Sequence, residues 1–314
     1  MRALLLVLSS SLPALAQEGP SLAFPVDCVL GETCMIQQLV DHDPGPDAQD
    51  FLCGSMSYDG HQGTDIRVPD MEALARGIPI LAAAPGTVLG TRNGVPDTGT
   101  GGFPDGQDCG NGVLIEHENG WQTQYCHMAQ GSVAVAQGDT VETGQPIGEM
   151  GFSGNTEFPH LHITVRHNGE VIDPFAPIDS GTCDSDVTLW ADDIPLSPGG
   201  ILSIGFAQAM PTFEAIQAGS ADADALSATG EAIIIWGFFH SGRTGDIVTA
   251  TITAPDGTTY HTQDITLERT QAQLFRASGR RIRDALPVGV YTGTVSLTRD
   301  GILVDEETTT ISVR

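Results

Sequence analysis

Hydrophobic and polar residues alternate in short runs over residues 55–180, and glycine, asparagine and proline separate these runs. Runs of this length and alternation predict β-strands. The expected strands cover residues 86–89, 112–117, 122–125 and 161–165. Asn119-Gly120 lies between two of them and is a strong signal for a tight hairpin turn. A short helix over residues 71–76 is the one convincing helical stretch in this region.

A second β-rich region is expected over residues 187–314. Its predicted strands cover residues 188–190, 233–239, 246–253, 289–296 and 308–313, with a helix near residues 212–218. Strands with turns at short spacing favour an all-β sandwich of immunoglobulin-like architecture. The expected fold class is therefore mainly β. No residue pattern identifies a partner for this C-terminal domain.

Two further segments complete the expected organisation. Residues 17–54 form an irregular N-terminal segment that is rich in aspartate, proline and glycine and contains cysteines. Residues 93–109 form a long loop, and long loops in compact domains are often functional. We interpret this loop either as a wall of a groove or as a plain surface insertion.

The charge of the chain excludes one class of partner. Its 314 residues include 40 acidic residues against 13 basic ones, all of them arginine, so the formal net charge is −27. Nucleic-acid binding needs clustered lysine and arginine and is not expected. Hydrophobic residues make up 40% of the chain, which is enough to form cores. No stretch beyond the N-terminus is long and apolar enough to predict a membrane span.

The N-terminus predicts export. Arg2 supplies a positive start, residues 4–8 are apolar, and Ala14-Leu15-Ala16 is an A-x-A cleavage pattern. Residues 1–16 are therefore expected to be a signal peptide of a periplasmic or secreted protein. The alternative is a buried N-terminal helix, which the order of these three features disfavours.

The cysteines fit an exported protein. The chain contains Cys28, Cys34, Cys53, Cys109, Cys126 and Cys183. An even number in an exported chain predicts disulfide bonds, but six cysteines allow fifteen pairings and their spacing does not decide among them. The pairing that we favour joins the first to the second, the third to the sixth and the fourth to the fifth. Metal binding is the rival interpretation, although no C-x-x-C pair is present.

Two short motifs carry the candidate chemistry: His61-Gln-Gly-Thr-Asp65 and His160-Leu-His162. Alternation along a strand places His160 and His162 on the same face. Three nitrogen and carboxylate ligands that leave a fourth position open are the arrangement of catalytic zinc. Together with the isolated His127, the two motifs predict one convergent metal site.

These residues carry a family resemblance. Residues 58–178 resemble the lysostaphin-type zinc metallopeptidases, the LytM-like family of peptidoglycan endopeptidases. Besides the two histidine motifs, the matching stretches are residues 112–127, 141–148, 151–154 and Asp173-Pro174. The chain departs from the family at Phe158, where glycine is usual, and at Ile163-Thr164, where Phe-Glu is common. The segments before and after this region lie outside the resemblance.

The resemblance implies a compact antiparallel β-sheet peptidase domain, with a groove over the sheet, within residues 55–180. It implies that His61, Asp65 and His162 bind one Zn²⁺ ion per chain and that His127 and His160 are catalytic. A zinc ion lowers the pKa of a bound water towards about 7 and polarises the scissile carbonyl. Either catalytic histidine is able to take the proton of the water and later protonate the leaving amine.

The predicted function is an exported zinc endopeptidase that hydrolyses peptide crosslinks of bacterial peptidoglycan. Its partners would be peptidoglycan peptide stems, and in a Gram-negative envelope the bond would be a D-alanyl–diaminopimelate crosslink. One alternative is a non-catalytic wall-binding protein or an activator of another wall hydrolase. Another is a zinc peptidase that acts on glycine-rich protein segments. The presence of all five site residues favours an enzyme.

Three other residues near these motifs have two interpretations each. His117 ends a predicted hairpin strand, and we expect it to be structural. Arg166 either binds a substrate carboxylate or is an ordinary solvated strand residue. Tyr58 either hydrogen-bonds the substrate or packs with its polar tip exposed.

Overall fold

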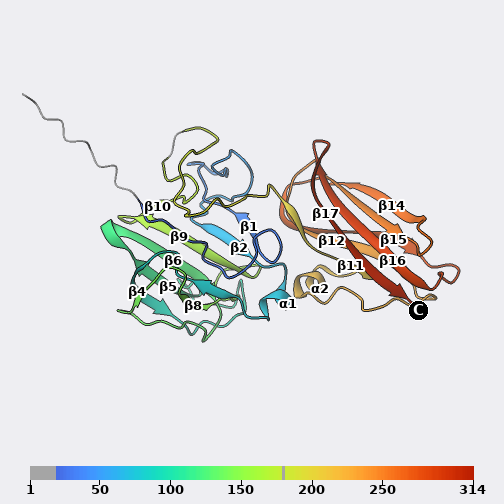
Figure 1. Ribbon diagram of the computed structural model, residues 1–314, viewed down its shortest axis with the longest axis horizontal. Helices are drawn as coiled ribbons and strands as arrows, with labels where there is room; N and C mark the ends of the chain where they lie inside the picture. Colours follow the sequence, from blue (N-terminus) through green and yellow to red (C-terminus); the bar gives the residue numbers. More distant parts are fainter. Residues whose placement is uncertain (1–18, 179–180) are drawn as a thin grey trace, which may run out of the picture.

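The computed structural model describes residues 19–178 and 181–314, so the expected signal peptide at residues 1–16 lies outside the described residues. Figure 1 shows two lobes: strands β1 to β10 belong to the first, and strands β11 to β17 form the second. The structure is mainly β, as predicted. Within the two described ranges, no helix is long and apolar enough to cross a membrane.

The first lobe is built on one large antiparallel sheet. The strands of this lobe are β1 (Met35–Gln38), β2 (Thr64–Arg67), β3 (Pro79–Leu81), β4 (Gly86–Arg92), β5 (Asn111–Glu116), β6 (Trp121–Met128), β7 (Thr140–Val141), β8 (Pro146–Glu149), β9 (His160–His167) and β10 (Glu170–Ile172). The order in the large sheet is β1-β2-β9-β6-β5-β4-β7, with β10 paired to β9, and β3 pairs with β8 separately. Helix α1 (Met71–Leu74) forms inside the predicted range, and a 3-10 turn η1 (Glu118–Gly120) links β5 to β6.

The hairpin between β5 and β6 forms as predicted from its two turn residues. Asn119 and Gly120 both have left-handed backbone conformations, with φ of 59° and 78°. The His117 N–H donates to the Trp121 carbonyl and closes the hairpin at 2.8 Å. The His117 ring is buried and hydrogen-bonds the Pro85 carbonyl and the Thr123 hydroxyl, so its role is structural, as expected.

The N-terminal segment is more ordered than the sequence predicts. We expected residues 17–54 to be irregular, but they supply β1, which pairs with β2 at the edge of the large sheet. Leu22 and Leu39 are fully buried in the core of the first lobe. Apolar contacts with residues far along the chain order this segment, despite its content of turn-forming residues.

Three disulfide bonds tie the first lobe together in the pairing that we favoured. They join Cys28 to Cys34, Cys53 to Cys183 and Cys109 to Cys126. No free cysteine occurs in the part of the chain that the structure describes. The last of these bonds fastens the end of the loop at residues 93–109 to β6, so the loop is anchored where it meets the sheet.

The second lobe consists of two antiparallel sheets that face each other. Its elements are β11 (Gly200–Ala207), α2 (Phe213–Ala218), β12 (Ala232–Gly242), β13 (Ile247–Thr253), β14 (Thr259–Thr266), β15 (Gln271–Arg281), β16 (Gly289–Arg299) and β17 (Ile302–Val313). The sheet orders are β11-β12-β15 and β14-β13-β16-β17. Buried residues from both sheets, such as Phe206, Ile235, Val248 and Leu297, form one core. The expected sandwich layering is present, and the immunoglobulin-like architecture stays a prediction.

The prediction of a strand at residues 188–190 is wrong. Its only ladder contact is an isolated bridge between Trp190 and Leu22. Trp190 packs instead against Phe24 and Phe175 in the core of the first lobe, with ring centroids 6.5 and 5.4 Å away. Burial of a large aromatic side chain, and not strand pairing, places this segment.

A buried arginine contacts both lobes where they pack together. Arg67, at the end of β2, is only 1% exposed. Its guanidinium donates to the side-chain oxygens of Gln37 in the first lobe and Gln273 in the second. It also lies over the rings of Phe158 and Phe238, 4.7 and 5.4 Å from their centroids. Burial lowers the pKa of Arg67 to about 9, and neutral acceptors from both lobes surround its charge.

Arg67→Ala should lower the free energy of unfolding by about 3 kcal/mol, because it leaves a large cavity and unpaired buried amide oxygens. Denaturant unfolding of the whole chain measures this change. The exposed Arg76 is the matched control, and Arg76→Ala should stay within about 0.5 kcal/mol of the wild type. Equal effects of the two substitutions would contradict the role of Arg67 between the lobes.

His240 should make the protein sensitive to acid. Burial, with the nearby charges of Arg67 and Arg299, lowers the pKa of His240 to about 3. As the pH falls from about 6.5 to about 3, the unfolded chain therefore binds a proton that the folded protein excludes, and stability decreases. Between pH 7 and pH 5 this should lower the unfolding free energy of the wild type by about 2 kcal/mol more than that of His240→Gln. Denaturant unfolding of chelator-treated proteins at both pH values checks this, and parallel losses would contradict it.

Candidate metal centre

The pairing of β2 with β9 places two of the candidate ligands opposite each other. Asp65 and His162 are direct partners in the antiparallel register, so their side chains leave the sheet on the same face. His160 lies two residues before His162 on β9 and shares that face, as the alternation predicts. His61 lies in the turn that leads into β2.

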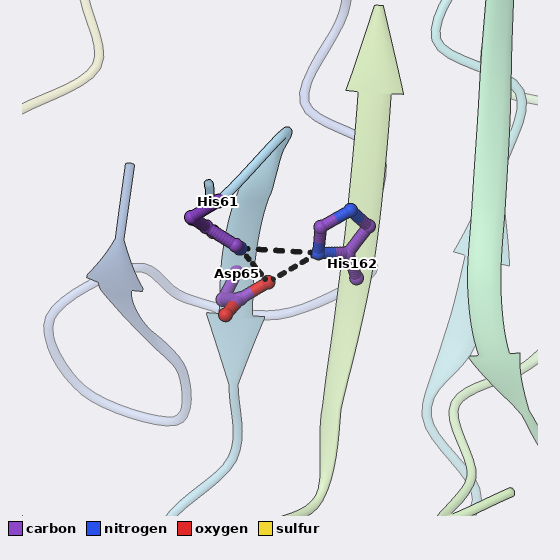
Figure 2. Close-up of side chains that lie close together, drawn as sticks. All are labelled: His61, Asp65 and His162. Carbon is purple, nitrogen blue, oxygen red and sulfur yellow. Dashed lines mark hydrogen bonds and ion pairs between the residues drawn. The ribbon is translucent and has the colours of Figure 1, made fainter. Parts of the chain in front are cut away.

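Three side chains converge there, as Figure 2 shows. His162 Nδ1 lies 2.8 Å from Asp65 Oδ1, and His61 Nε2 lies 3.2 Å from both of these atoms. Ligands at about 2.0–2.1 Å from a tetrahedral zinc ion lie roughly 3.3 Å from one another. The spacing of the three side chains is therefore close to that of a ligand set, and these residues form a group that could hold a metal ion.

The outer nitrogens of the two imidazoles have their own partners. His61 Nδ1 donates to the Leu39 carbonyl at 2.6 Å, and His162 Nε2 hydrogen-bonds the Thr164 hydroxyl at 3.0 Å. These bonds leave His61 Nε2 and His162 Nδ1 to present lone pairs towards the Asp65 carboxylate. Lone pairs and an anionic oxygen that converge at this distance suit a cation, and outer hydrogen bonds of this kind orient metal-bound histidines.

The N-terminal segment holds His61 in place. Besides the Leu39 carbonyl, the backbone N–H of Asp41 donates to the His61 carbonyl at 2.9 Å. The Asp41 carboxylate accepts the Gly60 N–H at 2.9 Å, which fixes the turn immediately before His61. Neither Leu39 nor Asp41 belongs to a recognisable motif, so the sequence offered no signal for this support.

His127 reaches the site through an unusual backbone conformation. Alternation along β6 would direct it to the side of the buried Tyr125, away from Cys126. His127 instead has a φ of 60°, next to a register irregularity between β5 and β6. This left-handed conformation re-aims the ring, whose centroid lies 4.6 Å from that of His160 and 6.0 Å from that of His162. Its Nδ1 donates to the Ser153 carbonyl at 2.8 Å, so Nε2 is the nitrogen left for chemistry.

His160 is fixed from the opposite side. Its Nδ1 donates to the Phe158 carbonyl at 2.9 Å and lies 3.1 Å from the Thr156 hydroxyl. The Phe158 ring also stacks on the imidazole, with centroids 4.4 Å apart. The remaining nitrogen, Nε2, lies 3.4 Å from Asp65 Oδ1. The structure thus brings all five predicted site residues together.

Burial and charge set the protonation of the group. Burial opposes ionisation of Asp65, but the neighbouring His61, His160 and His162 outweigh it and hold its pKa well below the usual value. Burial lowers the pKa of His162, and burial together with the other histidines lowers that of His127 further. At neutral pH the carboxylate is therefore anionic and these two imidazoles are neutral, which are the forms that bind metals and accept protons.

His61 and Tyr58 are shifted in the other direction. Burial would lower the pKa of His61, but the charge of Asp65 and its hydrogen bonds outweigh burial and raise it. Tyr58 lies over His61, with ring centroids 4.5 Å apart. Burial and the Asp65 charge raise the pKa of Tyr58 to about 12, so its hydroxyl remains a hydrogen-bond donor beside the site.

A groove runs from the metal centre along β6 and β9. Residues that line it, besides His127 and His162, are Tyr58, Gln62, Asp108, Cys109, Gln124, Cys126, Asn155, Thr164 and Arg166. Asp108 and Cys109 come from the end of the long loop at residues 93–109, which agrees with its interpretation as a groove wall. The site is therefore open along one side, where an extended peptide can approach.

Comparisons with known proteins find relatives of the region that contains this site. Residues 59–174 match the model of peptidase family M23. The cell division protein DipM of Caulobacter vibrioides is 31% identical over 119 residues, which cover 38% of this chain and 16% of DipM. The peptidoglycan DD-endopeptidase ShyA of Vibrio cholerae is 32% identical over 112 residues, which cover 36% of this chain and 21% of ShyA.

A solved structure is also similar to part of the chain. The catalytic domain of lysostaphin from Staphylococcus simulans is 26% identical, with a TM-score of 0.27 over 37% of this chain and 76% of that domain. This chain matches only 16% and 21% of the lengths of DipM and ShyA, so the similarity concerns one domain. The family match contains His61, Asp65, His127, His160 and His162. Residues 59–174 of this chain are therefore a domain of peptidase family M23.

Proposed function

We propose that this protein is an exported zinc-dependent endopeptidase that hydrolyses peptide crosslinks of bacterial peptidoglycan. The observation that carries the proposal is the convergence of His61, Asp65 and His162 beside a groove, inside a family M23 domain. The relative ShyA, which is named as a peptidoglycan DD-endopeptidase, supports the substrate class.

His61 Nε2, Asp65 Oδ1 and His162 Nδ1 would hold the zinc ion. Two neutral imidazoles and one carboxylate would leave a net positive charge on a divalent ion held there, which is the charge state that activates water. When bound, zinc supplies a water of lowered pKa and polarises the scissile carbonyl. The side chains would fix the ligand geometry, and the groove beside them would admit the peptide.

His127 and His160 would transfer the protons. Both donate their Nδ1 hydrogen to backbone carbonyls, of Ser153 and Phe158 respectively, so Nε2 is the nitrogen that each has left for proton transfer. A neutral imidazole at this position accepts a proton from the attacking water and returns it to the leaving amine. The low pKa that burial gives His127 keeps it ready to accept a proton at neutral pH.

Export to the periplasm or the medium is part of the proposal. Three disulfide bonds suit an oxidising compartment, where such bonds form and persist. The N-terminal pattern of residues 1–16 points the same way.

A second candidate is a non-catalytic protein that binds the wall or activates another wall hydrolase. The similarity to DipM, which is named as a cell division protein, is the observation that favours it. The complete set of five site side chains weighs against it. Metal analysis separates the two candidates, because the second predicts neither stoichiometric zinc nor chelator-sensitive hydrolysis.

Asp65→Ala should abolish zinc binding and lower the hydrolysis of purified sacculi by about a thousand-fold, since it removes a ligand and with it the activation of water. The measurements are zinc per chain by elemental analysis and product release by mass spectrometry. The exposed Asp59 is the matched control, and Asp59→Ala should keep both zinc and activity. Undiminished hydrolysis by zinc-free Asp65→Ala would refute the proposed metal site.

Gly63→Ala should weaken zinc binding by about 10- to 100-fold, an effect typical of disturbing the residues that orient a metal ligand. A Cβ at residue 63 would lie 2.6 Å from His162 Nε2 and from the Ile163 carbonyl oxygen, so the imidazole would have to move. Competition with a chromophoric chelator measures the affinity. Gly94→Ala is the control because a Cβ there meets nothing within 4 Å, and equal affinities of the two variants would contradict the expectation.

A further inference from the structure

An arginine occupies the groove next to the metal centre. In β9, the core-facing Ile163 and Val165 alternate with His162, Thr164 and Arg166, all three of which line the groove. Arg166 is therefore on the same face of the sheet as the candidate ligand His162. Its half-buried position brings its charge under the path that a peptide would follow to the metal centre.

The guanidinium is held towards the site. Arg166 Nη1 donates to Gln124 Oε1 at 2.8 Å, although Gln124 is the register partner of Thr164 and not of Arg166. The side chain therefore leans back along the strand by one residue pair. Same-face neighbours on a strand are roughly 7 Å apart, so the guanidinium lies roughly that far from His162. An extended peptide covers this distance in about two residues.

The surroundings leave the charge of Arg166 available. None of the ion pairs in residues 19–178 and 181–314 involves Arg166. The neighbouring Gln62, Gln124 and Thr164 are neutral, and Asp108 is the one carboxylate that lines this groove. A half-buried cation without an ion pair is unusual in a chain of formal charge −27, where acidic residues outnumber basic ones by 40 to 13.

The groove continues past Gln124, and an arginine lines this part as well. An adjoining cavity shares Asp108, Cys109 and Gln124 with it and adds Arg92, whose Nη1 donates to the Gly110 carbonyl at 3.1 Å. Two arginines therefore face one carboxylate along this surface. The acidic remainder of the protein repels an anionic peptide, and this surface provides a local attraction.

We propose that Arg166, oriented by Gln124, forms a subsite for a carboxylate that the substrate peptide carries about two residues from the scissile bond. The inference rests on the proposed function and deepens it by naming a feature of the substrate. Arginine binds carboxylates through a planar fork of N–H donors, and partial burial strengthens such a bond. In a D-alanyl–diaminopimelate crosslink, the free carboxyl groups of diaminopimelate are the matching chemistry.

The test compares two substrates that differ only in this charge. Crosslinked peptide dimers are prepared with free diaminopimelate carboxyl groups or with the same groups amidated. The zinc-loaded wild type should cleave the free acid with a kcat/KM at least about 10-fold higher, mainly through a lower KM. Arg166→Gln should lose this preference, with kcat/KM for the amidated dimer within about two-fold of the wild type.

Two variants separate the subsite from general effects of charge. Arg76→Gln removes the same charge from an exposed position outside the groove and should keep the full preference. Arg166→Lys keeps the charge without the planar fork and should retain only part of it. Zinc content and thermal unfolding establish that each variant is folded. If Arg166→Gln does not fold, the wild-type ratio for the two dimers decides.

The outcomes distinguish the two proposals. Failure of the zinc-loaded wild type to cleave either dimer overturns the proposed function and, with it, the subsite. Cleavage of both dimers by the wild type with equal kcat/KM overturns the subsite alone. An equal loss on both dimers in a folded Arg166→Gln also overturns the subsite, since it would show that Arg166 does not recognise the carboxylate.

Discussion

The buried carboxylate of Asp65 is the constraint on which the first lobe depends. An anion that is 2% exposed is costly unless positive or polar groups surround it, and here His61, His160 and His162 do so. The register of β2 against β9 fixes Asp65 opposite His162, and Gly63 leaves space for that imidazole. A slip by one residue would send Asp65 to the opposite face and disperse the group.

Arg67, two residues beyond Asp65, links this group to the second lobe. Its guanidinium contacts Gln273 and Phe238 there and lies over Phe158 in the first lobe. Phe158 in turn stacks on His160 and accepts the hydrogen bond from its Nδ1. The second lobe is therefore connected, through Arg67 and Phe158, to His160, one of the proposed catalytic histidines. Phe158 is also where the chain departs from the glycine that is usual in the resembling family.

The distribution of charge gives the groove a different character from the rest of the protein. The chain is strongly acidic, yet the surface along β6 and β9 beyond the metal centre is neutral or cationic apart from Asp108. Charges that line a concave surface act over short distances in a less polar environment and are screened less than those on open surface. The overall charge of the protein therefore repels an anionic peptide, whereas the charge of the groove attracts it. The charge of the groove determines whether the peptide binds, because it acts at the shortest distance.

Local patterns in the sequence were sufficient for the ligand motifs, the Asn119-Gly120 hairpin, the short helix near Met71 and most of the second-lobe strands, because periodicity and turn chemistry act over a few residues. Contacts between distant residues decided the rest. The left-handed backbone of His127 reverses the direction that alternation predicts for its ring. Burial of its side chain, and not strand pairing, determines the position of Trp190. The Leu39 carbonyl can accept the hydrogen bond from His61 only because β1 has joined the sheet. Such features depend on long-range packing, which leaves no periodic signal in the chain.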